Sequence, residues 1–209
     1  MEGLRIELAD QKTIEKGTEV LLEAFLNEGF TSFIFDFKKE KTKRYLYRAF
    51  LLRGKLNLEA GEQIFLAKKE GEIAGILFLK RNRKVPLGRL LKIIFPDLFK
   101  VFPLIGKIRF GNLIPGLKSL KTREKLEEPY LTLEAVGVGR EFQGMGIGKM
   151  LLQKTHSIAE EDPEIKGIYL FTADKKNREI YQHFGYQVIE EKKEKGITAY
   201  HMFRKNQKS

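Results

Sequence analysis

Apolar and polar residues are distributed along this chain in patterns that predict most of its elements. Alternation with a period of two, or a short apolar run, indicates a strand, and apolar positions three or four residues apart indicate a helix. Strands are expected at residues 4–8, 63–68, 72–80, 130–138, 167–172, 186–191 and 198–203. Helices are expected at residues 13–27, 39–52, 146–161 and 177–184. Gly29 and Gly54 are interpreted as the stop signals of the first two helices.

This order of elements predicts an α/β (α+β) fold in which a mixed, mostly antiparallel sheet of about six to seven strands is flanked by helices. Residues 82–128 interrupt the pattern, because they combine four prolines with many Leu, Ile and Phe residues. Since proline breaks regular helices, we predict short helices broken at Pro86, Pro96, Pro103 and Pro115. The chain is expected to be one domain, residues 1–209, with this segment inserted between two strands.

Composition and charge narrow the classes of function. The 209 residues include no cysteine, which excludes disulfides, thiolate metal sites and a cysteine nucleophile. The net charge is +11, and Lys80–Glu128 holds thirteen Lys or Arg against four Asp or Glu, a net of +9. Such asymmetry favours an anionic partner, which could be a coenzyme, an acidic substrate, nucleic acid or a membrane surface.

The remaining compositional signals leave several interpretations of the insertion open. Its mixture of basic and apolar residues suits a lid over an acceptor site, a segment in peripheral contact with a membrane, or extra helices that cover one sheet edge. Nucleic acid is not expected, because the aromatic and basic motif of an RNA-binding module is missing. The N-terminus does not resemble a signal peptide, so the expected location is cytoplasmic. Oligomerisation stays open.

Residues 143–148 form the motif with the clearest chemical meaning. Gln143-Gly144-Met145-Gly146-Ile147-Gly148 lies between a predicted strand and a predicted helix, where glycines allow a sharp turn and free N–H groups bind phosphate. A tight turn without a ligand is the alternative. A Walker loop is excluded because Met150 follows Gly148-Lys149, and a Rossmann fingerprint is excluded because Lys149 stands where Gly or Ala is needed.

The spacing of this motif resembles that of the GNAT acetyltransferase superfamily. Gln143, Gly146 and Gly148 match its pyrophosphate pattern Gln/Arg-x-x-Gly-x-Gly/Ala, and 177–186 match the pattern N-x-x-x-Y-x-x-F-G-F/Y. The insertion is similar to those of small-molecule acetyltransferases of the puromycin-modifying type. The resemblance implies an N-acetyltransferase that moves an acetyl group from acetyl-CoA to a primary amine of a small molecule or peptide by direct attack. The alternative is a non-catalytic CoA-binding protein whose insertion docks an anionic partner.

The resemblance also implies which residues bind the coenzyme. The backbone of Val136-Gly137-Val138 would pair with the pantetheine arm, and Gly137 and Gly139 suit a bulge that spreads the strands. An N–H near Val138 could stabilise the oxyanion. The implied acetyl-CoA-binding residues are Val136, Gly137, Val138, Gln143, Gly144, Met145, Gly146, Ile147, Gly148, Lys149, Asn177 and Tyr181. No metal is expected, because His156, His183 and His201 lack a metal-ligand spacing.

Two residues are candidates for the proton transfers of the reaction. Tyr181 matches the family's tyrosine and would protonate the departing thiolate, although it could instead be a core aromatic on an amphipathic helix. Glu134 lies four residues before Val138 on the predicted strand, and so should face the same side and serve as the base. It could equally be a surface residue. Glu128 and Tyr130 are weaker candidates. The run Phe33–Phe37 could form an acceptor wall, or pack in the core or a hinge.

Overall fold

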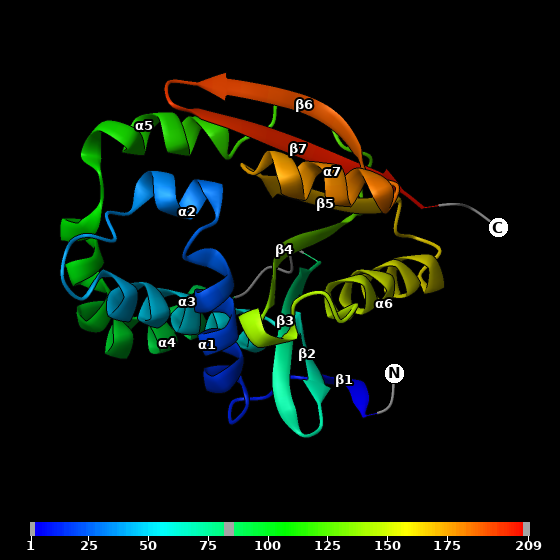
Figure 1. The fold of residues 1–209 in the computed structure, drawn as a ribbon, viewed down its shortest axis with the longest axis horizontal. Coiled ribbons are helices and arrows are strands. Elements are labelled where there is room, and N and C mark those ends of the chain that lie inside the picture. Colours follow the sequence, from blue (N-terminus) through cyan, green and yellow to red (C-terminus); the bar gives the residue numbers. More distant parts are fainter. Residues whose placement is uncertain (1–2, 82–85, 207–209) are drawn as a thin grey trace.

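The computed structural model describes residues 3–81 and 86–206, and its central feature is one seven-stranded sheet (Figure 1). The strand order is β1-β2-β3-β4-β5-β7-β6. Every neighbouring pair is antiparallel except β4 and β5, which are parallel. The strands are β1 Leu4–Leu8, β2 Gln63–Lys69, β3 Glu72–Lys80, β4 Leu131–Val138, β5 Gly167–Thr172, β6 Gln187–Glu194 and β7 Ile197–Lys205. The predicted mixed, mostly antiparallel sheet flanked by helices is therefore confirmed.

Helices cover both faces of the sheet, and each face has its own core. The helices are α1 Ile14–Phe25, α2 Gly29–Ile34, α3 Thr42–Glu59, α4 Leu87–Val101, α5 Phe110–Ser119, α6 Ile147–Glu161 and α7 Lys175–His183, with 3-10 turns η1 Phe102–Lys107 and η2 Arg140–Phe142. In Figure 1, α1 and α3 lie on the opposite side of β3 and β4 from α6. One core cluster joins α6 to the sheet, and a second contains Ile14 and Leu21 of α1. Among the described residues, no helix is long and apolar enough to cross a membrane.

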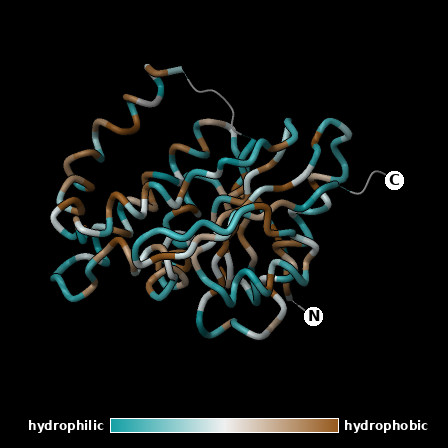
Figure 2. The backbone as a smooth tube through the Cα atoms, turned by 90° about the horizontal axis from the view of Figure 1, so that it is seen from above, coloured by the Kyte–Doolittle hydropathy of each residue, from teal (hydrophilic) through white to brown (hydrophobic). Residues whose placement is uncertain are grey.

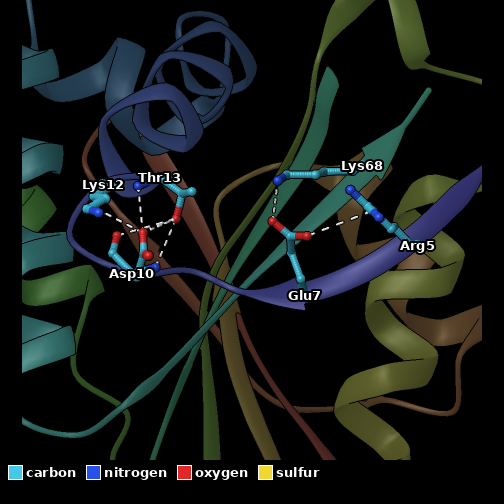
Figure 3. Close-up of polar contacts among 6 residues, drawn as sticks. All are labelled: Arg5, Glu7, Asp10, Lys12, Thr13 and Lys68. Carbon is cyan, nitrogen blue, oxygen red and sulfur yellow. Dashed lines mark hydrogen bonds and ion pairs between the residues drawn. The ribbon is translucent and has the colours of Figure 1, made fainter. Parts of the chain in front are cut away.

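The connection from β1 to α1 is fixed by side-chain contacts (Figure 3). The carboxylate of Asp10 accepts hydrogen bonds from the backbone N–H groups of Lys12 and Thr13, at 2.9 and 2.8 Å. These contacts turn the chain into the first helix, as an Asx turn does. On β1, Glu7 pairs with Lys68 of the neighbouring strand and lies 3.9 Å from Arg5. The predicted first strand and first helix are both confirmed.

Two glycines expected to stop helices have other roles. Gly29 is the first residue of α2, a helix that the sequence pattern missed, and the Glu28 carboxylate caps it by accepting a bond from Thr31 N–H at 2.8 Å. Gly54 lies inside α3, which continues to Glu59. A Cβ at Gly54 would approach Ile14 to 2.9 Å, so this glycine allows α3 to pack closely on α1.

The insertion is helical, but its prolines do not all break the helices. Pro96 lies inside α4 and Pro115 inside α5, so the prediction that the helices are broken at these two residues is wrong. Pro86 precedes α4, and Pro103 lies in the first turn of η1, where a missing N–H costs little. The helix α4 packs on α3, whereas α5 lies beside α2, β6 and β7. Residues 82–85, at the start of the insertion, lie outside the described residues.

Candidate active site

The two central strands β4 and β5 part along their length. Their pairing covers Leu131–Leu133 and Ile168–Leu170, after which β4 continues to Val138 and β5 to Thr172. A cavity of about 720 Å³ is lined by residues of both strands beyond this point. In open α/β sheets, ligands commonly bind in a crevice at the carboxyl ends of the strands. This cavity is therefore the candidate active site.

The lining of the cavity combines apolar and charged side chains. Its larger apolar members are Phe25, Phe30, Phe35, Leu46, Phe50, Leu104, Leu120 and Phe171. Its charged members are Glu23, Glu28, Arg53, Glu134, Arg140, Asp174 and Lys176. Two of the apolar residues, Leu104 and Leu120, come from the insertion, and Phe35 comes from the aromatic run that was a candidate acceptor wall. The cavity can hold a ligand that has an apolar body and a polar reacting group.

The glycine loop lies between β4 and α6. Gly144 and Gly146 adopt φ angles of 80° and 79°, and Gly146 immediately precedes the helix. A Cβ at either residue would meet nothing within 4 Å, so the backbone conformation, and not crowding, favours glycine there. The intrahelical bonds of α6 begin with Met150 N–H, which donates to the Gly146 carbonyl at 3.0 Å. The N–H groups of the preceding turn are thus available to an anion.

Val136, Gly137 and Val138, which were expected to bind the pantetheine arm, do not all line the cavity. Val136 lines the cavity, whereas Gly137 and Val138 are not among its lining residues. Gly137 stays in register opposite Ile76, and a Cβ there would approach Ala24 of α1 to 3.0 Å. Gly137 therefore allows close packing of α1. The bulge expected at Gly137 and Gly139 lies elsewhere on β4.

The bulge of β4 is at Glu134. Phe78 of β3 pairs with Ala135, and the next residue, Leu79, pairs with Leu133, so Glu134 is the extra residue. An extra residue reverses the alternation of side chains beyond it. Val138 packs in the core cluster on the α6 face, whereas Glu134 contacts α3. The prediction that these two residues face the same side is wrong, because it assumed an unbroken strand.

Glu134 is held by polar side chains from two elements. Its carboxylate lies 2.7 Å from Arg53 of α3 and 3.1 Å from Lys80 of β3, and it accepts a hydrogen bond from Asn57 at 2.6 Å. Its side chain is 10% exposed. Burial alone would raise the pKa of Glu134, but Arg53, Asn57 and Lys80 together outweigh that effect and hold the pKa below its usual range. The group is therefore a fixed carboxylate at neutral pH.

Tyr181 of α7 also lies at the cavity and, unlike Glu134, carries its proton. Its ring packs edge-on against Tyr186, with centroids 5.7 Å apart, and it lines the cavity together with Asn177. Burial raises the pKa of Tyr181 above its ordinary value, and the negative charges of Glu28 and Asp174 raise it further. The phenol is protonated at neutral pH. Asp174 also caps α7 by accepting bonds from the N–H groups of Lys176 and Asn177, which fixes the helix beside the cavity.

The structure brings several of the predicted site residues together and leaves others apart. The cavity is lined by Glu134, Val136, Gln143, Asn177 and Tyr181. Residues 144–149 belong to the adjoining loop and the first turn of α6. Glu128 and Tyr130 precede the paired end of β4 and are not among the lining residues. The Tyr130 ring packs instead on Tyr169 and Phe203.

Sequence reasoning missed the partners of Glu134 on α3. Arg53 and Asn57 lie one turn apart on the same helix face, as residues at i and i+4 do. This spacing would have been informative if the helix had been continued through Gly54.

The sequence also gave no indication that both ring nitrogens of His201 form hydrogen bonds. Tyr169 Oη lies 2.6 Å from its Nδ1, and its Nε2 donates to the Ser119 carbonyl at 3.0 Å.

No group of three or more His, Cys, Asp or Glu side chains within residues 3–81 and 86–206 is placed to hold a metal ion.

Comparison with known proteins identifies the family of the chain. The family model described as the acetyltransferase (GNAT) family matches residues 22–186. The chain belongs to the GNAT acetyltransferase family. The matched range contains the parted strands, the glycine loop and α7, so the resemblance carried by Gln143–Gly148 and 177–186 is confirmed. The protein is accordingly an acyl-CoA N-acyltransferase.

Individual relatives agree with this assignment. N-alpha-acetyltransferase 50 from Danio rerio is 26% identical over 118 residues, which cover 51% of this chain and 70% of that protein. A structure from Corynebacterium glutamicum, described as histone acetyltransferase HPA2 and related acetyltransferase, is 22% identical with a TM-score of 0.67, covering 99% and 98% of the two chains. The N-acetyltransferase PaiA from Thermoplasma acidophilum, solved in complex with coenzyme A, is 14% identical with a TM-score of 0.57, covering 97% and 98%. These two structures share the fold of this GNAT chain.

Proposed function

We propose that this GNAT protein transfers an acetyl group from acetyl-CoA to a primary amine of a small molecule or peptide by direct attack. The observation that carries the proposal is the cavity between the parted strands β4 and β5, with the glycine loop adjoining it. Acetyl-CoA supplies the thioester, and the chain supplies the binding surface and the proton transfers. The structural relative from Thermoplasma acidophilum that was solved with coenzyme A supports this choice of donor.

The glycine loop would hold the pyrophosphate. The backbone N–H groups of 144–149 would donate to the phosphate oxygens, aided by the helix dipole of α6 and the charge of Lys149. Val136–Val138 would pair through their backbone with the pantetheine arm, and a nearby N–H would donate to the developing oxyanion. Gln143 and Asn177, both at the cavity, would complete the contacts.

Glu134 and Tyr181 would carry the two proton transfers. The amine nitrogen attacks the thioester carbon and the carbon–sulfur bond breaks. The ammonium proton passes to Glu134, directly or through water, and the thiolate takes a proton from Tyr181 Oη. These roles need an ionised Glu134 and a protonated Tyr181 at the start of the reaction, and the surroundings of the two groups favour those forms.

The apolar part of the cavity supports an amine with an aromatic or aliphatic body as acceptor. Phe25, Phe35, Phe50 and Phe171 offer ring surfaces for such a group. The test is release of CoA thiol from acetyl-CoA over a panel that contains phenethylamine, ethanolamine and a short peptide. We expect release with an apolar amine. If acetyl-CoA binds and no amine or peptide provokes release, a non-catalytic CoA-binding protein is the better description.

A further inference from the structure

The outer face of the insertion has no role in the proposed function. Of the fourteen large hydrophobic side chains that are exposed among the described residues, eleven lie between Leu87 and Leu120. Scattered exposed apolar side chains are ordinary, but a concentration of them in one segment marks an interaction surface. Figure 2 shows the segment after residues 82–85 at the outer edge of the molecule, with much of its length hydrophobic.

The exposed residues of α4 and the start of η1 form one stripe. Their spacing of three or four residues places them on a single helix face. They are Leu87, Leu91, Phe95, Leu98, Phe99 and Phe102, and they are 43% to 75% exposed. The other apolar face of α4 packs against α3, where Asp97 pairs with Lys55 at 3.3 Å. The helix thus has two apolar faces, and within residues 3–81 and 86–206 the other elements cover one of them.

Basic side chains border this stripe. Arg89, Lys92 and Lys100 project from the remaining third of the helix, and all three are exposed. Arg89 lies 3.8 Å from Glu59 and Lys100 lies 2.6 Å from Asp97. The wider segment Lys80–Glu128 carries a net charge of +9. Helices that lie in a membrane interface combine an apolar face with Lys and Arg in this way. A second copy of the chain would suit the apolar stripe, but it would bring two strongly positive segments together.

We infer that the stripe of α4, with its flanking basic residues, docks on an anionic lipid bilayer. The helix has 15 residues, which span roughly 22 Å at 1.5 Å per residue, against about 30 Å for a hydrocarbon core. It therefore lies along the surface, with Phe95 and Phe99 in the headgroup boundary and Lys92 toward lipid phosphates. This docking does not depend on the acceptor proposed above.

The test uses vesicle sedimentation of the full chain. Vesicles of phosphatidylglycerol and phosphatidylcholine are compared with vesicles of phosphatidylcholine alone, at low and moderate salt. We expect binding to the anionic vesicles that weakens with salt, and a loss of about tenfold in partitioning for Phe95→Glu/Phe99→Glu. The control is Leu8→Glu, because Leu8 is a 59% exposed side chain on β1. It should bind as the wild type does.

Four results would overturn the inference. One is no sedimentation with anionic vesicles at either salt. Another is unchanged binding of Phe95→Glu/Phe99→Glu, with circular dichroism showing that the variant is folded. The third is self-association of the wild type, lost in the double variant, without vesicle binding. That result would assign the stripe to a second copy of this chain. Capture by immobilised polyglutamate but not by vesicles would assign it to an acidic protein, and would equally overturn the lipid assignment.

Discussion

At the scale of single residues, Glu134 and Tyr181 differ in the way their surroundings set their protonation. Glu134 is surrounded by Arg53, Asn57 and Lys80, which stabilise the ionised form. Tyr181 has a half-buried ring with two carboxylates nearby, which stabilise the neutral form. A pair of groups whose pKa values are pushed apart in one cavity is typical of an acid and a base that act together.

Tyr181→Phe is expected to lower turnover roughly 10- to 100-fold, because the thiolate would then leave without a positioned acid. The affinity for acetyl-CoA should be nearly unchanged, since only the hydroxyl is removed. Steady-state kinetics and coenzyme titration measure the two quantities. Tyr186→Phe is a suitable comparison, because that ring is adjacent but almost fully buried. Unchanged turnover in Tyr181→Phe would remove Tyr181 from the acid role.

Glu134→Gln is expected to lower kcat/KM at least roughly 100-fold at neutral pH, because the amide cannot accept the ammonium proton. Glu190→Gln is the matched control, since the Glu190 carboxylate also accepts hydrogen bonds, from Thr122 and Arg123, but lies outside the cavity lining. Urea denaturation of both variants separates a fall in activity from a fall in stability. Equal kcat/KM for Glu134→Gln and the wild type would show that another group takes the proton.

At the scale of elements, the junction of the glycine loop and α6 is the proposed pyrophosphate site. Gly146→Val should abolish detectable binding of acetyl-CoA, because a branched side chain at φ 79° distorts the loop and occupies the approach to the helix N-terminus. Gly71→Val is the control, since Gly71 also has positive φ, at 90°, and open space around it, but lies in the β2–β3 turn. Isothermal titration of each protein with acetyl-CoA makes the comparison. Normal affinity in Gly146→Val would refute the placement of the pyrophosphate.

His156 of α6 should make the free energy of unfolding depend on pH. Burial, and then the charge of Arg204, lower the pKa of His156 from 6.5 to about 4. Between these values the unfolded chain binds a proton that the folded chain does not, so stability falls as the pH drops. The loss should reach about 1 to 2 kcal/mol after allowance for the partial exposure of the ring. Urea denaturation at about pH 7.5 and about pH 5 measures it. His156→Gln should show a smaller pH effect, and an equal effect would contradict this account.

The elements that sequence periodicity missed share a cause, which is tertiary contact. Gly54 was expected to end a helix, but it lies inside α3, where the lack of a side chain lets the helix pack closely on Ile14. The sequence alone does not show that Ile14 lies nearby. Pro96 was expected to break a helix that packing against α3 supports. The bulge at Glu134 depends on the register with β3. Strands and helices with strong local patterns, such as β2, β3 and α6, were predicted close to their observed bounds.

At the scale of the whole molecule, the two halves of the site differ in how far the sequence could predict them. The glycine loop and α7 carry short motifs whose resemblance to the family's patterns implied Gln143, Asn177 and Tyr181 as site residues, and all three line the cavity. The side of the cavity proposed for the acceptor combines α1, α2 and α3 with residues of the insertion, which follow much later in the chain. Leu104 therefore carried no local signal of its place at the cavity.

The acetyl transfer itself is tested most directly by following the label of trideuterated acetyl-CoA into an amine. The protein is incubated with the labelled donor and phenethylamine, and the products are analysed by mass spectrometry. We predict a labelled amide in an amount equal to the free CoA formed, and little of it with Tyr181→Phe. Release of CoA without labelled amide, across the panel of amines and peptides, would mean that water receives the acetyl group and would contradict the proposed reaction.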